Sequence, residues 1–368
     1  MNHDLWLMAR AIPAYTAGGG RAALPKILKF DVTYRCESRC EFCFYWCAES
    51  RDNTASLMRG DTEMSLDQVE QHMVPIVRRL GIRYVNISGG EPLLRTDLGA
   101  IVRVLADAGA RVGLNTTLRG IRDDVLDALV DARARNVRVS IHGTRDVHDS
   151  LVQRPGAHDE LVGNMTRSMA RFRDAGQTRR PNVTFCYVVV PQNQHCILET
   201  VRLAEELGAD RFYLHFLEWQ PESCISQEWA ARAVSSAPER RAVDSELIYR
   251  QLEQIMVRQT ESRMRVLCHP FTPRCADEIR LWYGDPQFNR VRNCFFLWME
   301  TRIDPFGNVL PCAYLTIPSG NILDEDFERI WSGEHLSRTR SEVQSQLTEF
   351  CYKCCKLSRS WQNLLVHI

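Results

Sequence analysis

The stretch Ile27-Leu-Lys-Phe-Asp-Val-Thr-Tyr-Arg-Cys-Glu-Ser-Arg-Cys-Glu-Phe-Cys43 joins a short strand-like run, Ile27–Thr33, to three closely spaced cysteines. These are Cys36, Cys40 and Cys43, in the spacing Cys-x-x-x-Cys-x-x-Cys. Three thiolates on one loop can bind three irons of a cubic iron–sulfur cluster. The fourth iron then has no protein ligand, and an open metal position is where a substrate or cofactor can bind.

A second motif, Ser88-Gly-Gly-Glu-Pro92, follows another strand-like run, Arg83–Ile87. Gly89 and Gly90 lack a Cβ and allow the backbone to approach a ligand closely. The carboxylate of Glu91 can accept a hydrogen bond from a positively charged amino group. The cysteine triplet and this motif together resemble the radical S-adenosylmethionine (SAM) superfamily. The resemblance covers residues 25–357.

Zinc binding is the alternative for the triplet. Structural zinc takes four ligands, usually in pairs, and no paired knuckle follows Cys43. Cys47 could be the fourth ligand, but it would close the open position. We interpret Cys47 as a free or packed thiol. Five further cysteines show no ligand spacing and are expected to be buried thiols: Cys186, Cys196, Cys224, Cys268 and Cys275.

Strand-like and helix-like segments alternate along the first two-thirds of the chain, which predicts an α/β fold with a parallel sheet. The expected strands are Ile27–Thr33, Arg83–Ser88, Arg111–Asn115, Val137–His142, Asn182–Val190 and Arg211–Glu218. The expected helices between them are a helix from Ser65 to Leu80 with a capping box at Ser65 and Gln68, then Thr96–Ala108, Asp123–Arg133, Glu160–Asp174 and Gln194–Leu207. Six repeats are fewer than the eight of a closed barrel. The sheet is therefore expected to be open on one side, as in the partial (β/α)6 barrel that the resemblance implies.

The remaining boundaries follow from changes in pattern. We expect an N-terminal extension over 1–24, the partial barrel over 25–218, a connecting region over 219–292, a cysteine-rich hairpin-plus-helix domain over 293–357 and a tail over 358–368. The connecting region contains an amphipathic helix around 243–256 and a short strand, Met264–Leu267. The hairpin strands are Trp298–Ile303 and Val309–Tyr314.

The resemblance implies a role for several residues near the strand ends. Cys36, Cys40 and Cys43 would hold a [4Fe–4S] cluster whose fourth iron is chelated by SAM. Other SAM contacts are expected from Phe42 beside the adenine, Gly89, Gly90, Glu91, Asn115, Ser140 at the ribose and Arg154 near the carboxylate. His142 stands where related families often have Asp. His142, His215 and Glu218 are candidate catalytic bases because of their position.

A second cysteine set comprises Cys294, Cys312, Cys351 and Cys354, with Gly307 five residues before Cys312. It resembles the C-terminal SPASM extension, or its shortened form, the twitch domain. Because only Cys355 follows, we favour the shortened form with one auxiliary [4Fe–4S] cluster, fully ligated by thiolates. Zinc remains an alternative for this pair-plus-pair spacing, and Cys355 could replace Cys354.

The resemblance implies that a reduced cluster cleaves SAM to a 5′-deoxyadenosyl radical, which abstracts hydrogen from the substrate. The auxiliary cluster would accept an electron, giving a dehydrogenase-type oxidoreductase supplied by a reductant such as flavodoxin or ferredoxin. We expect a small biosynthetic metabolite: a sugar, an aminocyclitol or a natural-product intermediate. About 25 residues precede the first strand, too few for the recognition module of many peptide modifiers, and Ala313 stands where sulfatase-maturing enzymes have Asp. The alternatives are a maturase for a ribosomally made peptide or protein and, from another class, a non-catalytic metal-binding or electron-transfer protein.

Composition limits the partners. Lys plus Arg and Asp plus Glu both number 46, so the net charge is zero and no nucleic-acid partner is indicated. No apolar run approaches the ~20 residues of a membrane span. Fourteen cysteines without a signal peptide indicate a reducing, cytoplasmic location. Arg133, Arg135 and Arg138 are expected to be solvated.

Overall fold

The computed structural model describes residues 3–43, 62–218, 241–259, 261–286, 288, 294–315, 317–347 and 349–354. Cys47, Cys355, the tail 358–368 and much of the connecting region lie outside these residues.

The described strands form one nine-stranded sheet in the order β7-β6-β5-β4-β3-β2-β1-β8-β9. Their bounds are β1 Ile27–Thr33, β2 Tyr84–Gly89, β3 Arg111–Thr116, β4 Asn136–Ser140, β5 Asn182–Val189, β6 Arg211–Phe216, β7 Arg265–His269, β8 Glu300–Ile303 and β9 Val309–Leu310. All neighbouring strands from β7 to β8 are parallel, and only β8 and β9 are antiparallel. The parallel α/β fold is thus confirmed.

The six predicted parallel strands are β1 to β6, and two more parallel strands, β7 and β8, join the sheet at its edges. β7 pairs with β6, and β8 pairs with β1. An edge strand presents unpaired backbone groups, and each added strand satisfies one such edge. Local sequence pattern predicts the strands themselves but not this long-range pairing.

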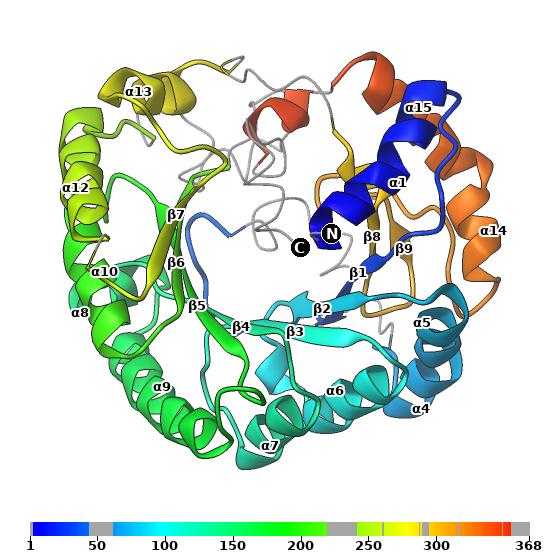
Figure 1. Ribbon diagram of the computed structural model, residues 1–368, viewed down its shortest axis with the longest axis horizontal. Helices are drawn as coiled ribbons and strands as arrows, with labels where there is room; N and C mark the ends of the chain where they lie inside the picture. The colour runs from blue at the N-terminus through cyan, green and yellow to red at the C-terminus, as the bar shows by residue number, and fades with distance from the viewer. Residues whose placement is uncertain are drawn as a thin grey trace.

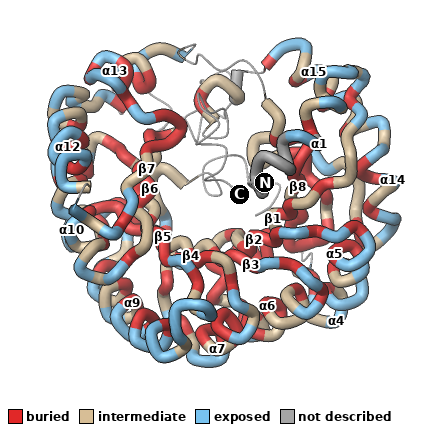
Figure 2. Tube along the Cα trace, in the orientation of Figure 1, coloured by how far each residue is buried: buried red, intermediate tan, exposed pale blue. Residues whose placement is uncertain are grey.

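The sheet curves, and helices cover its outer side (Figure 1). In chain order, the described residues form the helices and helical turns α1 His3–Ala17, α4 Leu66–Gln68, the π-helical turn η1 Val69–Met73, α5 Val74–Leu80, the short 3-10 turn η2 Pro92–Leu94, α6 Leu98–Asp107, α7 Asp123–Asp131, α8 Arg145–Leu151, α9 Ala157–Asp174, α10 Ile197–Glu206, α12 Ser245–Arg258, α13 Ala276–Gly284, the 3-10 turn η5 Phe296–Trp298, α14 Phe327–Ser332, α15 Glu334–Ser345 and the 3-10 turn η6 Glu349–Lys353. Figure 2 shows the strands mostly buried and the outer surface of the helices exposed.

The helix that begins after Ser65 starts as its sequence predicts. The Ser65 hydroxyl accepts a hydrogen bond from the backbone N–H of Gln68, and the Gln68 side chain accepts one from the Ser65 N–H. This reciprocal capping box satisfies two amide groups that lack helical partners. Gly81 ends α5 in the left-handed conformation.

Alternate residues of each strand face opposite sides of the sheet. Phe30, Ile87 and Val139 belong to the main core beneath the helices. The other set lies on the side turned away from the helices, which we call the inner face. It includes Lys29, Asp31, Asn115, Arg138, Ser140, Cys186, Tyr213, His215, His269, Glu300 and Arg302. The inner face is therefore rich in polar and charged side chains.

A second, smaller core covers the inner face where the first strands begin. Ile27 and Tyr84, which begin β1 and β2, pack there with Ala11 of α1 and with η5. The cysteines of the second set are packed against the same core. This end of the sheet thus carries the C-terminal cysteines.

Candidate cluster and cofactor site

The cysteine loop after β1 is fastened to the end of α8. The backbone N–H of Arg39 donates to Val152 O at 3.0 Å, and that of Glu41 donates to Leu151 O at 3.3 Å. Within the loop, Cys43 N–H donates to Cys40 O at 3.0 Å. The thiols of Cys36, Cys40 and Cys43 are neither buried nor fully exposed. The loop is therefore fixed by its backbone, while its thiols stay accessible.

The glycine pair packs directly against the start of this loop. Gly90 N–H donates to Thr33 O, and Glu91 N–H donates to Arg35 O, both at 2.8 Å. A Cβ on Gly89 would lie 2.1 Å from Thr33 O, and one on Gly90 would lie 2.2 Å from Arg35 O. Gly89 also has a φ of +132°, which L side chains rarely adopt. The glycines thus position the cysteine loop, a role that the sequence does not reveal.

Glu91 is buried, and four donors surround its carboxylate. One oxygen accepts from the Thr116 hydroxyl at 2.6 Å and from Leu93 N–H at 3.1 Å. The other accepts from the Thr117 hydroxyl at 2.6 Å and its N–H at 2.7 Å. Burial raises the pKa of Glu91, while these hydrogen bonds oppose the rise. Glu91 therefore ties the loop after β2 to the end of β3, and its contact with the SAM amino group stays a prediction.

Replacing Glu91 by glutamine should destabilise the protein and weaken SAM binding. The new amide NH2 would face hydroxyl and amide donors, leaving buried groups of Thr117 or Thr116 unsatisfied. We expect a loss of about 2–4 kcal/mol in the free energy of unfolding. Chemical denaturation and equilibrium dialysis with SAM measure both effects. The matched variant Glu199→Gln changes a carboxylate on the outer helix α10 and should leave both unchanged; equal effects in the two variants would contradict this role.

His142 supports the cysteine loop through Phe42. The two rings meet edge to face with centroids 4.7 Å apart. The Nδ1 atom of His142 accepts from Val188 N–H at 3.2 Å, and its own backbone N–H donates to His148 Nδ1 at 3.0 Å. Burial holds the pKa of His142 well below its usual value, so the ring is neutral at pH 7. These contacts give His142 a positioning role; its predicted role as a base stays a prediction.

Arg154 is held in an ion-pair network that reaches the cysteine loop. Its guanidinium lies 2.6 Å from the Glu160 carboxylate, which is also 3.6 Å from Arg119. Arg119 in turn pairs with Glu37, the residue after Cys36. The structure thus connects Arg154 to the cysteine loop, and the partner of its guanidinium is the Glu160 carboxylate. Its contact with the SAM carboxylate stays a prediction.

The other predicted residues lie on or beyond the strands that follow. Asn115 and Ser140 are half-buried on the inner face of β3 and β4. His215 is half-buried on β6, where burial and the charge of Arg138 lower its pKa to about 4. Glu218 lies just beyond β6, and its carboxylate accepts a hydrogen bond from the Tyr314 hydroxyl. That contact joins the end of β6 to the segment after Cys312.

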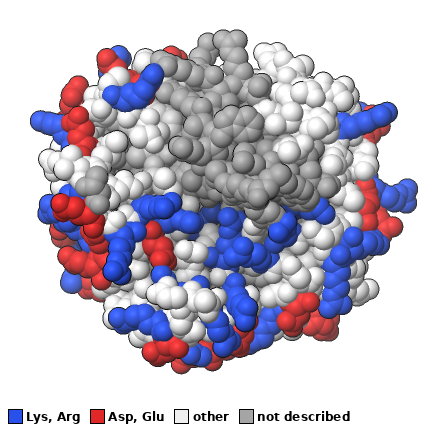
Figure 3. All heavy atoms as spheres, in the orientation of Figure 1, with Lys and Arg blue, Asp and Glu red and all other residues white. Residues whose placement is uncertain are grey.

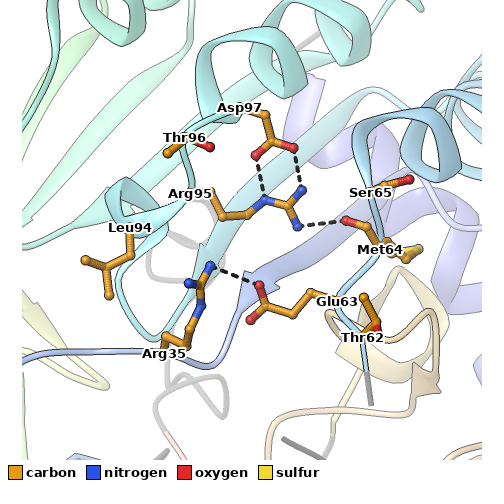
Figure 4. Close-up of a pocket in the computed structure, with 9 residues that line it drawn as sticks. All are labelled: Arg35, Thr62, Glu63, Met64, Ser65, Leu94, Arg95, Thr96 and Asp97. Carbon is orange, nitrogen blue, oxygen red and sulfur yellow. Dashed lines mark hydrogen bonds and ion pairs between the residues drawn. The ribbon is translucent and has the colours of Figure 1, made fainter. Parts of the chain in front are cut away.

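A pocket of about 540 Å³ lies beside the cysteine loop (Figure 4). Arg95 forms its most buried wall, pairs with Asp97 at 2.6 Å and donates to Val32 O and Met64 O. Arg35, on the other wall, pairs with Glu63 at 3.3 Å. Both arginines are thus balanced by carboxylates within the pocket wall. The pairs hold the segment before α4 against the end of β1.

The second cysteine set is brought together as its spacing predicts. Burial and the neighbouring thiols raise the pKa of Cys294 and Cys312 to about 12, and Cys351 and Cys354 contribute to both shifts. Buried thiols that oppose one another's ionisation need a bound cation to become thiolates. Four gathered thiols can bind the four irons of one cubic cluster, and they are also the ligand set of a structural zinc ion.

The two cysteine sets lie at opposite ends of β1. Cys36 follows its last residue, whereas the second set packs against the core that contains its first residue, Ile27. The seven residues of β1 span roughly 20 Å at about 3.3 Å per residue. The polar side chains of the inner face lie between the two ends.

The remaining cysteines were predicted to be buried, and the structure contradicts this for one of them. Cys196 and Cys268 are buried, as expected. Cys275 is exposed and immediately precedes α13, so the prediction that it is buried is wrong. Its position at a helix start, where the chain turns, accounts for the exposure.

Basic side chains gather on the face shown in Figure 3, over the part of the sheet that Figure 1 labels β2 to β4. Several strands begin at or directly after a basic residue: Lys26, Arg83, Arg111, Arg135, Arg211 and Arg265. The zero net charge therefore conceals an uneven distribution. No helix in the described ranges is long and apolar enough to cross a bilayer.

The sequence did not identify some residues of the inner face, and for one of them it predicted the wrong environment. Arg138 is half-buried on β4, between the core residues Val137 and Val139, so the prediction that it is solvated is wrong. Tyr213 and His269 are buried on the same face. The alternation of Arg138 and Tyr213 with apolar residues inside predicted strands was the available signal. His269 lies two residues beyond the predicted strand Met264–Leu267, because β7 extends to His269.

Two family models match the chain: the radical SAM superfamily over residues 30–204 and an iron–sulfur cluster-binding domain, SPASM, over residues 294–355. An AdoMet-dependent heme synthase of Methanosarcina barkeri is 26% identical, covering 85% of this chain and 84% of that protein. A PqqA peptide cyclase of Rhodopseudomonas palustris is 25% identical, covering 78% and 67%. The structure of Streptococcus suis SuiB bound to S-adenosylmethionine matches with a TM-score of 0.62 at 16% identity, covering 87% of this chain and 68% of SuiB.

The SuiB likeness is one of fold, and it agrees with the partial barrel described above. The SPASM match favours iron–sulfur over zinc at the second cysteine set. Together with the cysteine loop at the end of β1 and the four gathered C-terminal thiols, these matches show that the chain is a radical SAM protein, with SAM and a [4Fe–4S] cluster as cofactors and a C-terminal SPASM iron–sulfur domain.

Proposed function

We propose that the protein is a cytoplasmic oxidoreductase that removes hydrogen from a small, polar biosynthetic metabolite: a sugar, an aminocyclitol or a natural-product intermediate. One observation carries this proposal: the two cysteine sets lie at the two ends of β1, and a polar inner face lies between them. A substrate on that face would lie between a site of radical initiation and a site that accepts an electron.

The residues present fit these cofactors. Cys36, Cys40 and Cys43 would hold the SAM-binding cluster, and the four gathered C-terminal cysteines would hold one auxiliary [4Fe–4S] cluster. When bound, these groups supply a 5′-deoxyadenosyl radical and an acceptor for the substrate's second electron. A small reductant protein of the flavodoxin or ferredoxin type would provide the initiating electron.

The chain's own residues position SAM and the substrate and exclude water from the site. We assign SAM contacts to Phe42, Gly89, Gly90, Glu91, Asn115, Ser140 and Arg154, all on or beside the strand ends. The Phe42–His142 ring pair forms an apolar wall beside the cysteine loop. His215 is the candidate base for the proton that leaves the substrate during a two-electron oxidation, because its imidazole is neutral at pH 7. His142 and Glu218 are weaker candidates, since each already accepts a hydrogen bond from the protein.

A peptide substrate is the second candidate. It is favoured by the peptide cyclase among the relatives and by the structure of SuiB bound to precursor peptide SuiA, which matches with a TM-score of 0.63. An electron carrier without SAM cleavage is the more distant alternative.

The rate of 5′-deoxyadenosine formation distinguishes these substrates. We add the polar small-molecule fraction of an extract from cells that express the protein. This fraction is expected to accelerate 5′-deoxyadenosine formation about tenfold or more over SAM and reductant alone. The peptide fraction, separated by ultrafiltration, should have little effect. The metabolite that disappears can then be identified by mass spectrometry. Acceleration by the peptide fraction alone would contradict the small-molecule proposal and support the second candidate.

A further inference from the structure

The N-terminal extension packs against the C-terminal helices, close to the second cysteine set (Figure 1). Side chains of the C-terminal region donate hydrogen bonds to its backbone: Gln344 to Tyr15 O, Arg340 to Gly20 O at 3.3 Å, Trp298 to Arg21 O at 2.9 Å and Trp331 to Ala23 O at 3.1 Å. A Cβ on Gly20 would lie 1.8 Å from Ser337 O of α15. The extension is therefore fixed in place by the iron–sulfur domain, although the barrel separates the two along the chain.

Tyr15, in the last turn of α1, lies beside the first cysteine of this set. Its ring centroid is 4.7 Å from that of Phe295, the residue after Cys294, and 4.8 Å from that of Trp298. Burial raises the pKa of Tyr15, and the charge of Cys294 raises it further. The phenol and the Cys294 thiol are thus close enough for each to affect the charge of the other.

The Tyr15 ring also forms part of the wall around the cysteines. Tyr15 and all four cysteines of the second set pack against the same small core, which includes Leu297 and Val343. Tyr15 is half-buried, so its ring stands between this core and solvent. Tyr15 therefore limits the access of water to the cysteine set from the side of α1.

Hydrogen bonds to the sulfurs and exposure to solvent both affect the reduction potential of an iron–sulfur cluster. A one-electron reduction adds one negative charge, and part of this charge lies on the cysteine sulfurs. A donor directed at such a sulfur stabilises the reduced cluster more than the oxidised one. The backbone N–H of Phe296 already provides one donor to Cys294. A phenol hydroxyl beside the same sulfur would add a second.

We propose that the Tyr15 hydroxyl donates a hydrogen bond to the Cys294 sulfur of the bound auxiliary cluster and thereby raises the reduction potential of that cluster. The Tyr15 ring, for its part, keeps water away from the same sulfur. Tyr15 thus acts through Cys294 and does not contact the substrate. A raised potential suits a cluster that accepts the substrate's second electron, and in this respect the inference rests on the proposed function.

A redox titration of the reconstituted protein, followed by electron paramagnetic resonance, measures this potential without any substrate. The auxiliary signal is the one that Cys312→Ser lacks. Tyr15→Phe removes only the hydroxyl. At a fixed ambient potential, the ratio of reduced to oxidised auxiliary cluster should then fall about fivefold, the effect of one hydrogen bond of ordinary strength. The first cluster, at the other end of β1, should titrate as in wild type.

Two further variants separate the ring from the hydroxyl and provide a control. Tyr15→Ala removes both, so a chelator should extract iron from the auxiliary cluster faster than it does from Tyr15→Phe, which keeps the ring. Tyr249→Phe is the matched control, because the Tyr249 hydroxyl of α12 donates to Arg274 O at 2.8 Å and the residue packs on the main core. Tyr249→Phe should titrate as wild type does.

If Tyr15→Phe does not retain its auxiliary iron, 3-fluorotyrosine in place of Tyr15 decides, since it keeps the hydroxyl and nearly the shape of the ring. Electron–nuclear double resonance should show a fluorine coupling to the reduced auxiliary cluster, and its absence would overturn the inference. An unchanged ratio in Tyr15→Phe, beside the expected loss of iron in Cys312→Ser, would overturn this inference alone. Full iron content in Cys312→Ser would contradict the auxiliary cluster of the proposed function and, with it, this role of Tyr15.

Discussion

Replacing Gly89 by alanine is expected to displace the cysteine loop and prevent stable assembly of the first cluster. The new Cβ would lie 2.1 Å from Thr33 O, a backbone atom that cannot move without moving β1. The residue would also be held at a φ of +132°. Backbone strain of about 1–3 kcal/mol and overpacking of about 1–3 kcal/mol add to each other. We expect little iron at the first site and a loss of SAM binding of about tenfold or more.

The chain offers controls that separate crowding from backbone strain. Gly109 has a φ of +106°, but a Cβ added there would have no other atom within 4 Å, so Gly109→Ala carries the strain without the crowding. Gly90→Ala carries the crowding without a positive φ, because its Cβ would lie 2.2 Å from Arg35 O. Gly90→Ala should therefore resemble Gly89→Ala in iron content and SAM affinity. Gly109→Ala should lose stability alone. Normal SAM binding by Gly90→Ala would contradict the close approach described here.

Replacing Cys312 by serine should remove the auxiliary cluster. Iron content is expected to fall from about eight to about four atoms per chain, since each [4Fe–4S] cluster holds four irons. Oxidised product should fall below detection, because the substrate's second electron would lose its acceptor. Iron analysis and product assays measure the two effects, and 5′-deoxyadenosine formation reports separately on the first cluster.

Cys275→Ser is the matched control, because Cys275 is exposed and lies outside both cysteine sets. Its iron content should equal that of wild type. If Cys312→Ser kept full iron content and product formation, the auxiliary cluster proposed here would have no role. A decrease in zinc in place of iron would return the second cysteine set to the zinc alternative.

Local sequence pattern predicted much of the fold. β1 has the bounds expected from its β-branched and aromatic residues, and the capping box at Ser65 forms as predicted. These features depend on neighbours within a few positions along the chain. The pairing of β7 with β6 and of β8 with β1 depends on contacts between distant segments. Spacing within a single element does not encode such pairing.

The candidate site also combines features that local sequence predicts with features that depend on distant segments. The cysteine spacings identified both cysteine sets, because ligands of one cluster often lie close in sequence. The donors around Glu91 come from Thr116 and Thr117, about 25 positions away, and no motif connects them. Arg138 was placed inside a predicted strand and yet expected to be solvated. Arg138 is half-buried because it lies on the concave side of the curved sheet, and local sequence pattern does not encode that curvature.

The most direct test of the central claim is 5′-deoxyadenosine formation by anaerobically reconstituted protein given SAM and a strong reductant, compared with Cys36→Ala. The account predicts 5′-deoxyadenosine from the wild type and none from the variant, in which the loop has lost one of its three thiolates. Equal amounts from both proteins would contradict the assignment of this loop to the first cluster. Absence of 5′-deoxyadenosine from wild type that holds its clusters and binds SAM, with every substrate fraction supplied, would contradict radical initiation itself.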